Sequence, residues 1–554
     1  MSRSCVLIFV GLVVGSMTLH ASPLPATEPL HQQVDALIES HPDFRAPAAA
    51  RTDDASFLRR IHLDLAGSIP SATEVREFLA DQSPDKRAKR IDKLLESPQY
   101  ARRMQHVFDV MLMERRPSIH IKVQPWQDYL RESFLQNKSW LDLSQEILTA
   151  DGVDEQTRPA ARFLLDRELK IDSVTRDVGR LFLGRDLECA QCHDHPAIDD
   201  YLQRHYYGIA AFINRSYIFK DPKTKQSLIG EKAEGEIEFT SVFTDEKDET
   251  SPRILDAPPI SDPPNGDELY KIKPEKNVRS VPIYSRRLQL AKSITDPSNQ
   301  SFRLNIANRI WAMMMGRGLV EPLDMWHEDN PPSHNELLDR LADSLLQHDY
   351  DLKYLIRELA LSKTYQRSSQ SHPPVSLDPG QTTDFSVALL KPLSPEQLAW
   401  SMMQATGLVD QQVATLVAKQ RKADDPQLAD DPVWQENALN TALRSNTEIF
   451  AKVFGHEGVR NDGFDASADQ ALFLRNGDLL QRWVTLKNGL SDRLTALDND
   501  QVAEEFYLSI FSRLPTAEEA QPIVDLLDQS KQRKIDLQHL VWAGLTSSAF
   551  RFNH

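Results

Sequence analysis

Residues 53–67 read DDASFLRRIHLDLAG, and the spacing of apolar side chains in this stretch predicts a helix. Phe57, Ile61 and Leu65 are four residues apart, so in a helix they form one apolar stripe that faces a core. Directly downstream, residues 71–74 read SATE, a capping box that predicts the start of a second helix. The stretch therefore favours a mainly helical fold.

The same start signals recur along the chain. Ser-Pro pairs at 83–84 and 97–98, and further capping boxes at 333–336 and 394–397, predict four more helix starts. Helical spacing also predicts helices over 124–136, 139–150, 172–190, 285–295 and 302–315. Most of the chain is thus expected to be helical.

One stretch departs from this pattern. Residues 236–243, EIEFTSVF, alternate polar and apolar side chains as a half-buried strand does, and prolines surround them. We therefore expect two helical domains with a small β-containing, proline-rich insertion between them. The expected segments are a signal peptide (1–21), a linker (22–52), a helical domain with the cysteine motif (53–215), the β-containing segment (216–283), a helical part of the second domain (284–367), a linker (368–390) and its C-terminal helical part (391–554).

The first 21 residues resemble a targeting segment. Arg3 supplies a positive charge, an apolar run follows over residues 5–14, and small and polar residues end at Ala21. This pattern predicts a cleaved secretory signal, with an uncleaved N-terminal anchor as the alternative. The mature protein is expected to be periplasmic or secreted, with no membrane span after signal removal.

Composition excludes some classes of protein. The chain has 554 residues, of which 40% are hydrophobic and 26% charged, the balance of a globular protein rather than a disordered one. Its 81 acidic residues outnumber its 64 Lys and Arg residues, which gives a net charge of −17. A nucleic-acid partner would require a basic footprint, so none is expected.

The motif with the clearest chemistry is CAQCH at residues 189–193. Of the three cysteines, Cys5 would leave with the signal, so only Cys189 and Cys192 remain, and His193 follows directly. On one helical turn these three side chains share a face, where two thiols can add to the vinyl groups of a haem and the imidazole can bind its iron. The spacing therefore predicts a c-type haem site.

Other chemistries use the same residues. Cys189 and Cys192 with His193 and His195 could bind zinc, which accepts thiolate and imidazole ligands. The two cysteines could instead form a disulfide, or be inert. For the haem interpretation the sixth iron ligand is open, because no methionine occurs between residues 194 and 312. His205 is the best candidate, with a half-buried core histidine as the alternative, and the iron could also be five-coordinate.

Several segments resemble a known pair of families. The segments 57–67, 188–196 and 206–212 resemble the first of two paired domains of unknown function in secreted planctomycete proteins, often labelled cytochrome-associated. The segments 305–311, 316–320, 331–339 and 364–369 resemble the second. The resemblance covers about residues 53–250 and 284–550, and implies the C-x-x-C-H site but no established reaction.

The second half lacks recognised catalytic motifs, including a phosphate-binding glycine loop, a G-x-S-x-G elbow and H-E-x-x-H. Its candidate polar and aromatic residues, each interpreted mainly as structural, are Arg309, Trp311, His334, Asp339, Thr364 and Tyr365. Two function classes follow. The first is an exported haem-binding protein that acts in electron transfer or redox chemistry with an unknown redox or envelope partner. The second is a non-redox envelope protein with a zinc or disulfide site, acting as an assembly or glycan-binding partner.

Overall fold

The helix expected at residues 53–67 joins the two halves of the molecule. In the computed structural model, which describes residues 28–195, 198–240, 247–264, 268–370, 384–455 and 467–553, this helix is α2 (Asp54–Ala66). Asp53 caps its first turn by accepting from the backbone N–H of Ser56, and Gly67 ends it in a left-handed conformation with φ 70°. The predicted helix is confirmed.

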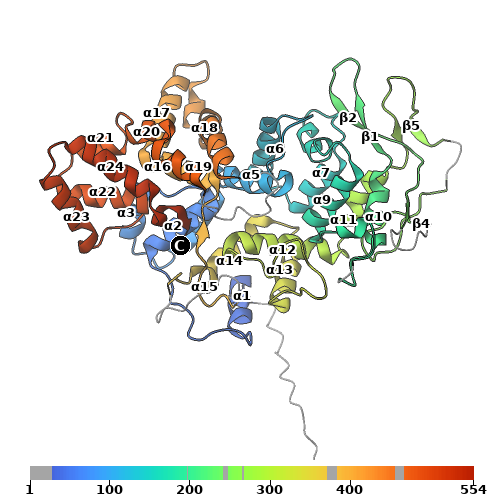
Figure 1. Cartoon of the computed structure of the whole chain (residues 1–554), viewed down its shortest axis with the longest axis horizontal. Coiled ribbons are helices and arrows are strands. Elements are labelled where there is room, and N and C mark those ends of the chain that lie inside the picture. The colour runs from blue at the N-terminus through green and yellow to red at the C-terminus, as the bar shows by residue number, and fades with distance from the viewer. Residues whose placement is uncertain are drawn as a thin grey trace, which may run out of the picture.

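A first hydrophobic core gathers helices from the N-terminal half and from the middle of the chain. Phe57, Ile61 and Leu65 of α2 are buried in it, as their spacing predicts. The helices on this side (Figure 1) are α1 (Leu30–Glu39), α3 (Ala72–Ala80), α4 (Lys86–Leu95), α5 (Pro98–Met113), α6 (Val123–Leu135), α7 (Trp140–Thr149), α8 (Arg162–Leu165), α9 (Ile171–Leu183), α10 (Gln203–Ile213), α11 (Arg286–Ile294), α12 (Gln300–Met315), α13 (Asn335–Gln347), α14 (Leu352–Leu361) and α15 (Lys363–Gln366).

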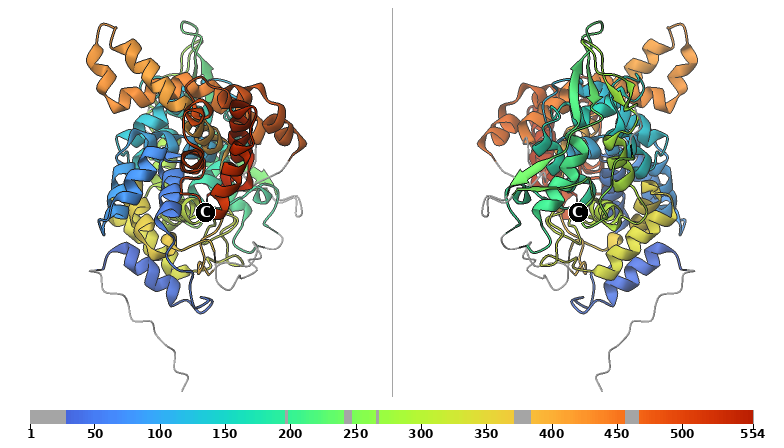
Figure 2. Two further views of the ribbon diagram at one scale, coloured as in Figure 1. Left: turned by 90° about the vertical axis from the view of Figure 1, so that its left-hand side faces the viewer. Right: turned by 90° about the vertical axis from the view of Figure 1, so that its right-hand side faces the viewer.

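A second core is formed by the C-terminal helices, and α2 reaches into it. Leu63 and Ile69 belong to this core, and the buried Arg59 donates to the carbonyls of Ile510 and Phe550 at 3.1 and 2.9 Å. The helices are α16 (Pro395–Thr406), α17 (Leu408–Gln420), α18 (Pro432–Phe454), α19 (Ala468–Asn476), α20 (Asp478–Val484), α21 (Leu490–Thr495), α22 (Asn499–Phe511), α23 (Ala517–Asp528), α24 (Arg533–Thr546) and α25 (Ser548–Arg551). In Figure 2, α17 and α18 project from the body in orange.

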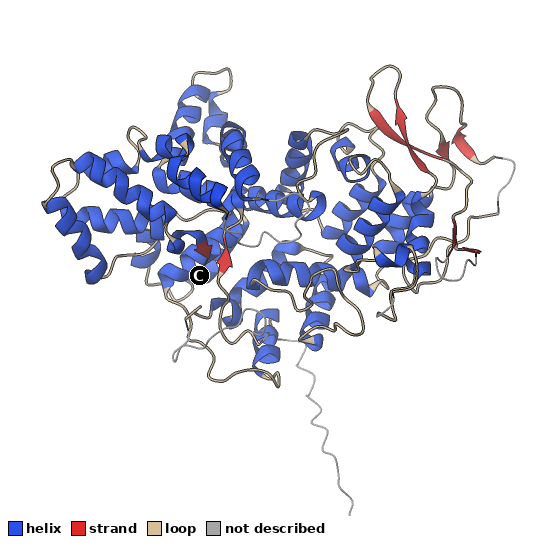
Figure 3. Cartoon of the chain, viewed as in Figure 1, coloured by secondary structure: helices blue, strands red, loops and turns tan. Residues whose placement is uncertain are grey.

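The strands are short and form two-stranded antiparallel sheets. Three sheets lie in the expected β-containing segment, towards one end of the molecule in Figure 3, and the fourth joins β7 to β8 near the C-terminus. The pairs are β1 (Ser216–Lys220) with β2 (Ser227–Glu231), β3 (Glu238–Thr240) with β4 (Lys247–Glu249), β5 (Tyr270–Ile272) with β6 (Val281–Pro282), and β7 (Lys391–Pro392) with β8 (Phe552–Asn553). The mainly helical fold, with 25 α-helices among the described residues, is confirmed. Of the predicted strand 236–243, residues 238–240 form β3 and residues 241–243 lie outside the described part.

Two predicted helix starts are wrong. At 83–84 the predicted start is too early: α4 begins at Lys86, and the hydroxyl of Ser83 donates to Asp81 at 2.5 Å. At 333–336 the N-cap is His334 rather than Ser333, and the Ser333 hydroxyl lies 3.1 Å from the His334 ring instead. In both cases a neighbouring side chain engages the serine that the sequence pattern assigns to the helix.

Two further observations concern the N-terminal segments. The expected linker 22–52 holds α1, whose Val34 and Ile38 are fully buried in the first core. The expected signal peptide lies outside the described residues. Within the described ranges, none of the helices has the length and apolar character needed to cross a bilayer.

Candidate functional site

The cysteine motif lies in a loop and not on a helix, which corrects the expected helix over 172–190. Helix α9 ends at Leu183 because Gly184 adopts a left-handed conformation (φ 71°), and the Arg185 N–H then bonds back to the Gly179 carbonyl at 3.0 Å. Cys189–Gln191 form a single 3₁₀ turn in the loop that follows. The motif is therefore placed by loop contacts rather than by helical periodicity.

Helix α10 holds the middle of this loop. Tyr207 and Gln203 both donate to the carbonyl of Gln191, at 3.0 and 3.3 Å, and the backbone N–H of Gln203 donates to Asp194 at 2.7 Å. Ala190 is buried. The loop between the two cysteines is thus fixed to the body of the first core.

Both cysteines of the motif are exposed residues. Cys189 and Cys192 are exposed and carry separate, unbridged sulfurs. Because the carbonyl between them is fixed by α10, both thiols stand at an anchored surface. This arrangement can react with a group that approaches from outside.

His193 is oriented by the backbone of the next residue. Its Nδ1 lies 2.6 Å from the carbonyl oxygen of Asp194. A carbonyl can only accept, so Nδ1 carries the hydrogen and the lone pair of the neutral ring is on Nε2. This is the tautomer that a histidine needs to bind a metal through Nε2.

His195 lies beside a histidine from the second half of the chain. Tyr201 packs edge-on against His195 on one side and His327 on the other, with ring centroids 6.1 and 5.7 Å apart. Burial lowers the pKa of His195, and the imidazoles of His327 and His193 lower it further. Even so, across the described ranges no three or more His, Cys, Asp or Glu side chains are grouped closely enough to hold a metal ion. The residues predicted to bind zinc are thus not arranged as a metal-binding set in the described part of the chain.

His205 is buried and held by two hydrogen bonds. The N–H of Leu202 donates to its Nδ1 at 3.4 Å, and its Nε2 lies 2.9 Å from the Asp256 carboxylate. With Nδ1 accepting, Nε2 carries the hydrogen and donates to Asp256. To serve as the sixth ligand, as predicted, His205 would have to give up one of these bonds.

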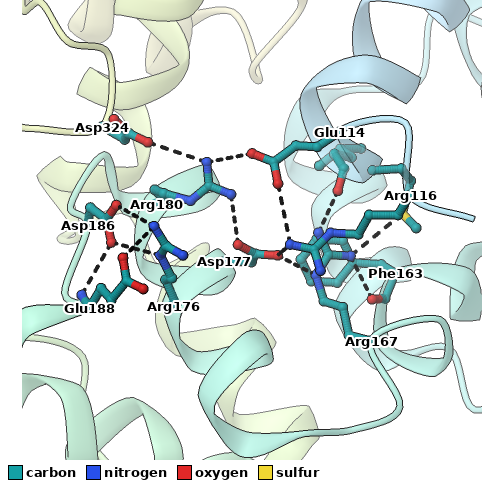
Figure 4. Close-up of polar contacts among 12 residues, drawn as sticks. Glu114, Arg116, Phe163, Arg167, Arg176, Asp177, Arg180, Asp186, Glu188 and Asp324 are labelled. Atoms are coloured by element: carbon teal, nitrogen blue, oxygen red, sulfur yellow. Dashed lines mark hydrogen bonds and ion pairs between the residues drawn. The ribbon is translucent and has the colours of Figure 1, made fainter. Parts of the chain in front are cut away.

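A buried ion cluster lies close to Asp186 and Glu188, which precede the cysteines (Figure 4), and sequence patterns did not indicate it. At its centre, Arg180 of α9 contacts Glu114 at 2.7 Å, Asp177 at 2.7 Å and Asp324 at 3.4 Å. All four side chains are less than 10% exposed. The signal that could have revealed the cluster is Asp177 and Arg180 placed among apolar residues of one predicted helix.

Asp177 meets two more guanidinium groups. Its carboxylate lies 2.6 Å from Arg167 and 3.0 Å from Arg116. Burial raises the pKa of Asp177, but Arg167, Arg180 and Arg116 outweigh burial and lower that pKa to about 2. The carboxylate is therefore ionised throughout the neutral range.

The cluster is connected to the cysteine loop and to the second half of the chain. Arg176 contacts Asp186 at 3.1 Å and Glu188, the residue before Cys189, at 2.6 Å (Figure 4). The N–H of Asp186 donates to the carbonyl of Asp324 at 2.8 Å. The loop that carries the thiols is thus held by charged contacts from α9 and by a backbone hydrogen bond to the second half of the chain.

Comparison with known proteins gives two family matches. Residues 33–217 match PSCyt2, a protein family of unknown function (DUF1549), and residues 286–527 match PSD1, a second such family (DUF1553). No curated protein and no solved structure matches the chain.

Proposed function

Because the chain joins a PSCyt2 domain to a PSD1 domain, it belongs to the planctomycete-type cytochrome-associated proteins of unknown function, and we propose that it is an exported redox protein with a covalently attached c-type haem. Cys189 and Cys192 would hold the haem and His193 would bind its iron. The electron partner would be another redox protein of the envelope.

The observation that carries the proposal is the state of the motif residues. Two unbridged, exposed thiols stand on an anchored loop, and the next side chain is an imidazole whose Nδ1–H points at a carbonyl. A zinc site would need four ligands in reach, and among the described residues no three such side chains are grouped closely enough to hold a metal ion. A c-type haem needs only the two thiols and the Nε2 lone pair from this loop.

The attachment chemistry balances without a further reactant. Each Sγ–H adds across a vinyl C=C, so that an S–C bond forms and the hydrogen goes to the neighbouring vinyl carbon, and nothing leaves. Once bound, the haem would supply a one-electron carrier. Asp194 would hold the His193 ring through its carbonyl, which fixes the ligating tautomer.

Export is the second part of the proposal. The charged start, apolar run and small exit residues of 1–21 support a cleaved signal, and thioether formation takes place outside the cytoplasm. N-terminal sequencing of periplasmic material should begin near Ser22 or Pro23. Recovery of Met1 would indicate an anchored protein instead.

The haem is tested by co-expression with a haem maturation system, followed by a haem stain on a denaturing gel. Wild type should retain the stain, Cys189→Ser and Cys192→Ser should lose most or all of it, and the exposed His539→Ala should match wild type. His193→Ala should change the visible spectrum, and His205→Ala should move it from low to high spin if His205 is the sixth ligand. A colourless protein that binds one zinc ion, or whose thiols react freely, would refute the haem and leave the non-redox envelope function.

A further inference from the structure

A cavity of about 470 Å³ lies between helices from the two halves of the chain, and none of the described residues that line it belongs to the cysteine motif. One wall is the face of α5 that carries Arg103, His106 and Val110, which are three and four residues apart and so share one side of the helix. The opposite wall is the end of α12 with Ala312 and Met313. The volume is within the range of small-molecule sites, which occur preferentially between domains.

The formal charges of the lining cancel. Among the described residues that line the cavity, the acidic side chains are as many as the arginines and lysines. The acids are Asp64, Glu114, Glu321, Asp324 and Glu396, and the bases are Arg103, Arg180, Arg309, Arg317 and Lys391. A lining without net charge attracts neither anions nor cations as a whole.

At the floor of the cavity an acid and a base are bound to each other. Asp64 accepts from Lys391 at 2.7 and 2.8 Å, from Asn553 at 2.9 Å and from the Tyr365 hydroxyl at 2.8 Å. The lysine also donates to the carbonyls of Met313 and Met314. A ligand would therefore have to displace protein groups in order to pair with either charge.

The other acids of the lining also have partners within the protein. Glu396 accepts from both ends of the Arg115 guanidinium, and this pairing outweighs burial and lowers the pKa of Glu396 to about 2. Arg180 contacts both Glu114 and Asp324, as described above. Glu321 accepts from the backbone N–H of Gly318 at 3.0 Å.

This balance of charges disfavours a charged ligand. An ion that enters the cavity loses its water, and the loss is repaid only where an opposite charge is available to it. Here the charges of the lining cancel and its acids are already engaged. A neutral molecule loses less on leaving water, so the same lining accepts it at a lower cost.

His106 offers the cavity a polar group that the protein does not use. Among the described residues, none forms a hydrogen bond with either nitrogen of this ring. Burial lowers the pKa of His106 to about 3; Glu396 raises that pKa, whereas Arg102, Arg103 and Arg115 lower it. The ring is therefore neutral near pH 7, with one N–H that can donate and one lone pair that can accept.

Apolar side chains supply the rest of the surface around His106. They come from α5, from α12 and from the segment that follows α12, and they include Val107, Val110, Met111, Ala312, Met313 and Leu323. Small-molecule sites commonly combine such apolar walls with a few polar groups that fix the orientation of the ligand.

We propose that this cavity binds a small neutral molecule with an apolar body and one carboxamide or hydroxyl group. The apolar body would pack between α5 and α12, and the polar group would form a hydrogen bond with His106. The proposed haem uses none of these residues, so this second site goes beyond the proposed function.

The charge preference is tested with three probes that have nearly the same shape: neutral benzamide, anionic benzoate and cationic benzamidinium. Binding to the purified full chain at pH 7 is followed by saturation-transfer NMR titration. Benzamide should bind, and both ions should bind about tenfold more weakly or not at all. Absence of benzamide binding at millimolar concentration would overturn the proposal, as would a benzoate or benzamidinium affinity equal to that of benzamide.

Variants locate the binding. His106→Leu removes the hydrogen bond and should weaken benzamide binding about fivefold, whereas His539→Leu, at an exposed position on α24, should leave it unchanged. Ala312→Phe narrows the cavity without altering charge, so it should also weaken binding and keeps the test decisive if His106→Leu does not fold. Unchanged affinity in either folded cavity variant would overturn this location. The double variant Cys189→Ser/Cys192→Ser should still bind benzamide, so the haem proposal can fail independently.

Discussion

Replacing Asp177 with asparagine should destabilise the protein more than most single substitutions. The side chain is 2% exposed and its two oxygens meet Arg167, Arg180 and Arg116 at 2.6–3.0 Å. An amide of the same size removes the negative charge that the three guanidinium groups share and takes from the buried Arg167 its ion-pair partner. Breaking a buried ion pair in this way costs about 3–5 kcal/mol.

In Asp177→Asn the arginines keep other hydrogen-bond and ion-pair partners, so we expect a loss of stability near the lower end of that range. Arg180 keeps Glu114 and Asp324, and Arg167 keeps the carbonyls of Leu112 and Phe163 at 2.7 and 2.8 Å. We therefore expect the free energy of unfolding to fall by about 3 kcal/mol at pH 7. With a urea dependence of about 3 kcal/mol per molar, the midpoint should fall by about 1 M.

The dependence of stability on pH below pH 4 provides a second measurement. Because the folded-state pKa of Asp177 lies below its ordinary value of 3.8, at about 2, its stabilising effect is fully present above pH 4 and is lost as the pH falls towards 2. This pKa shift corresponds to about 2 kcal/mol of stability that the wild-type protein loses as the pH falls from 4 towards 2. The asparagine variant has no carboxylate at this position, so it should not show this loss.

The assay is urea denaturation followed by tryptophan fluorescence at pH 7 and at several values down to pH 2.5. Asp424→Asn, at an exposed position, is the matched control and should leave the midpoint unchanged at pH 7. The reasoning would be refuted if Asp177→Asn lowered the free energy of unfolding by less than 1 kcal/mol at pH 7. It would also be refuted if the variant and wild type lost the same stability between pH 4 and pH 2.5.

Three further outcomes are expected. Gly67→Ala should lower the free energy of unfolding by about 1 kcal/mol or more, because Gly67 has φ 70° and an added Cβ would lie 3.1 Å from Arg103; a midpoint within error of wild type would count against this. Ser394→Ala should cost about 1 kcal/mol by removing the capping box of α16, and Ser394→Thr should restore most of it. Burial, and then His41, lower the pKa of His334 to about 4. The neutral ring therefore stabilises the fold above pH 6.5, and this effect is lost as the pH falls to 4. In His334→Gln the urea midpoint should change less between pH 6.5 and pH 4 than in wild type.

Local signals in the sequence predicted local structure well. Ser71, Ser97 and Ser394 cap helices as expected, because each capping bond joins residues only three apart. The same pattern failed at Ser83 and Ser333, where a neighbouring carboxylate or imidazole contacts the hydroxyl. At these two positions the N-cap is Asp85 or His334, one or two residues later than predicted, a shift that residue spacing alone does not encode.

Contacts between distant segments could not be predicted in this way. The cysteine motif was recognisable because its residues are adjacent, but its anchors on α10 and the neighbouring His327 come from elsewhere in the chain. The ion cluster was missed because charged residues in a helix are usually solvated, and only the fold brings Glu114 and Asp324 to Arg180.

The partners of Asp64 have a consequence for the order in which the protein can mature. This carboxylate is synthesised early, whereas Tyr365, Lys391 and Asn553 follow 301, 327 and 489 residues later. At a synthesis rate of 5–20 residues per second, the last partner arrives roughly 25–100 s after Asp64. The ion-pair partner Lys391 arrives before the neutral Asn553, so the four contacts of this site can form together only when nearly the whole chain is available. The two family domains are separate by sequence comparison but share this site, so a gene cut between them should yield an N-terminal half that lacks the partners of Asp64 and is less stable than the same half in the full chain.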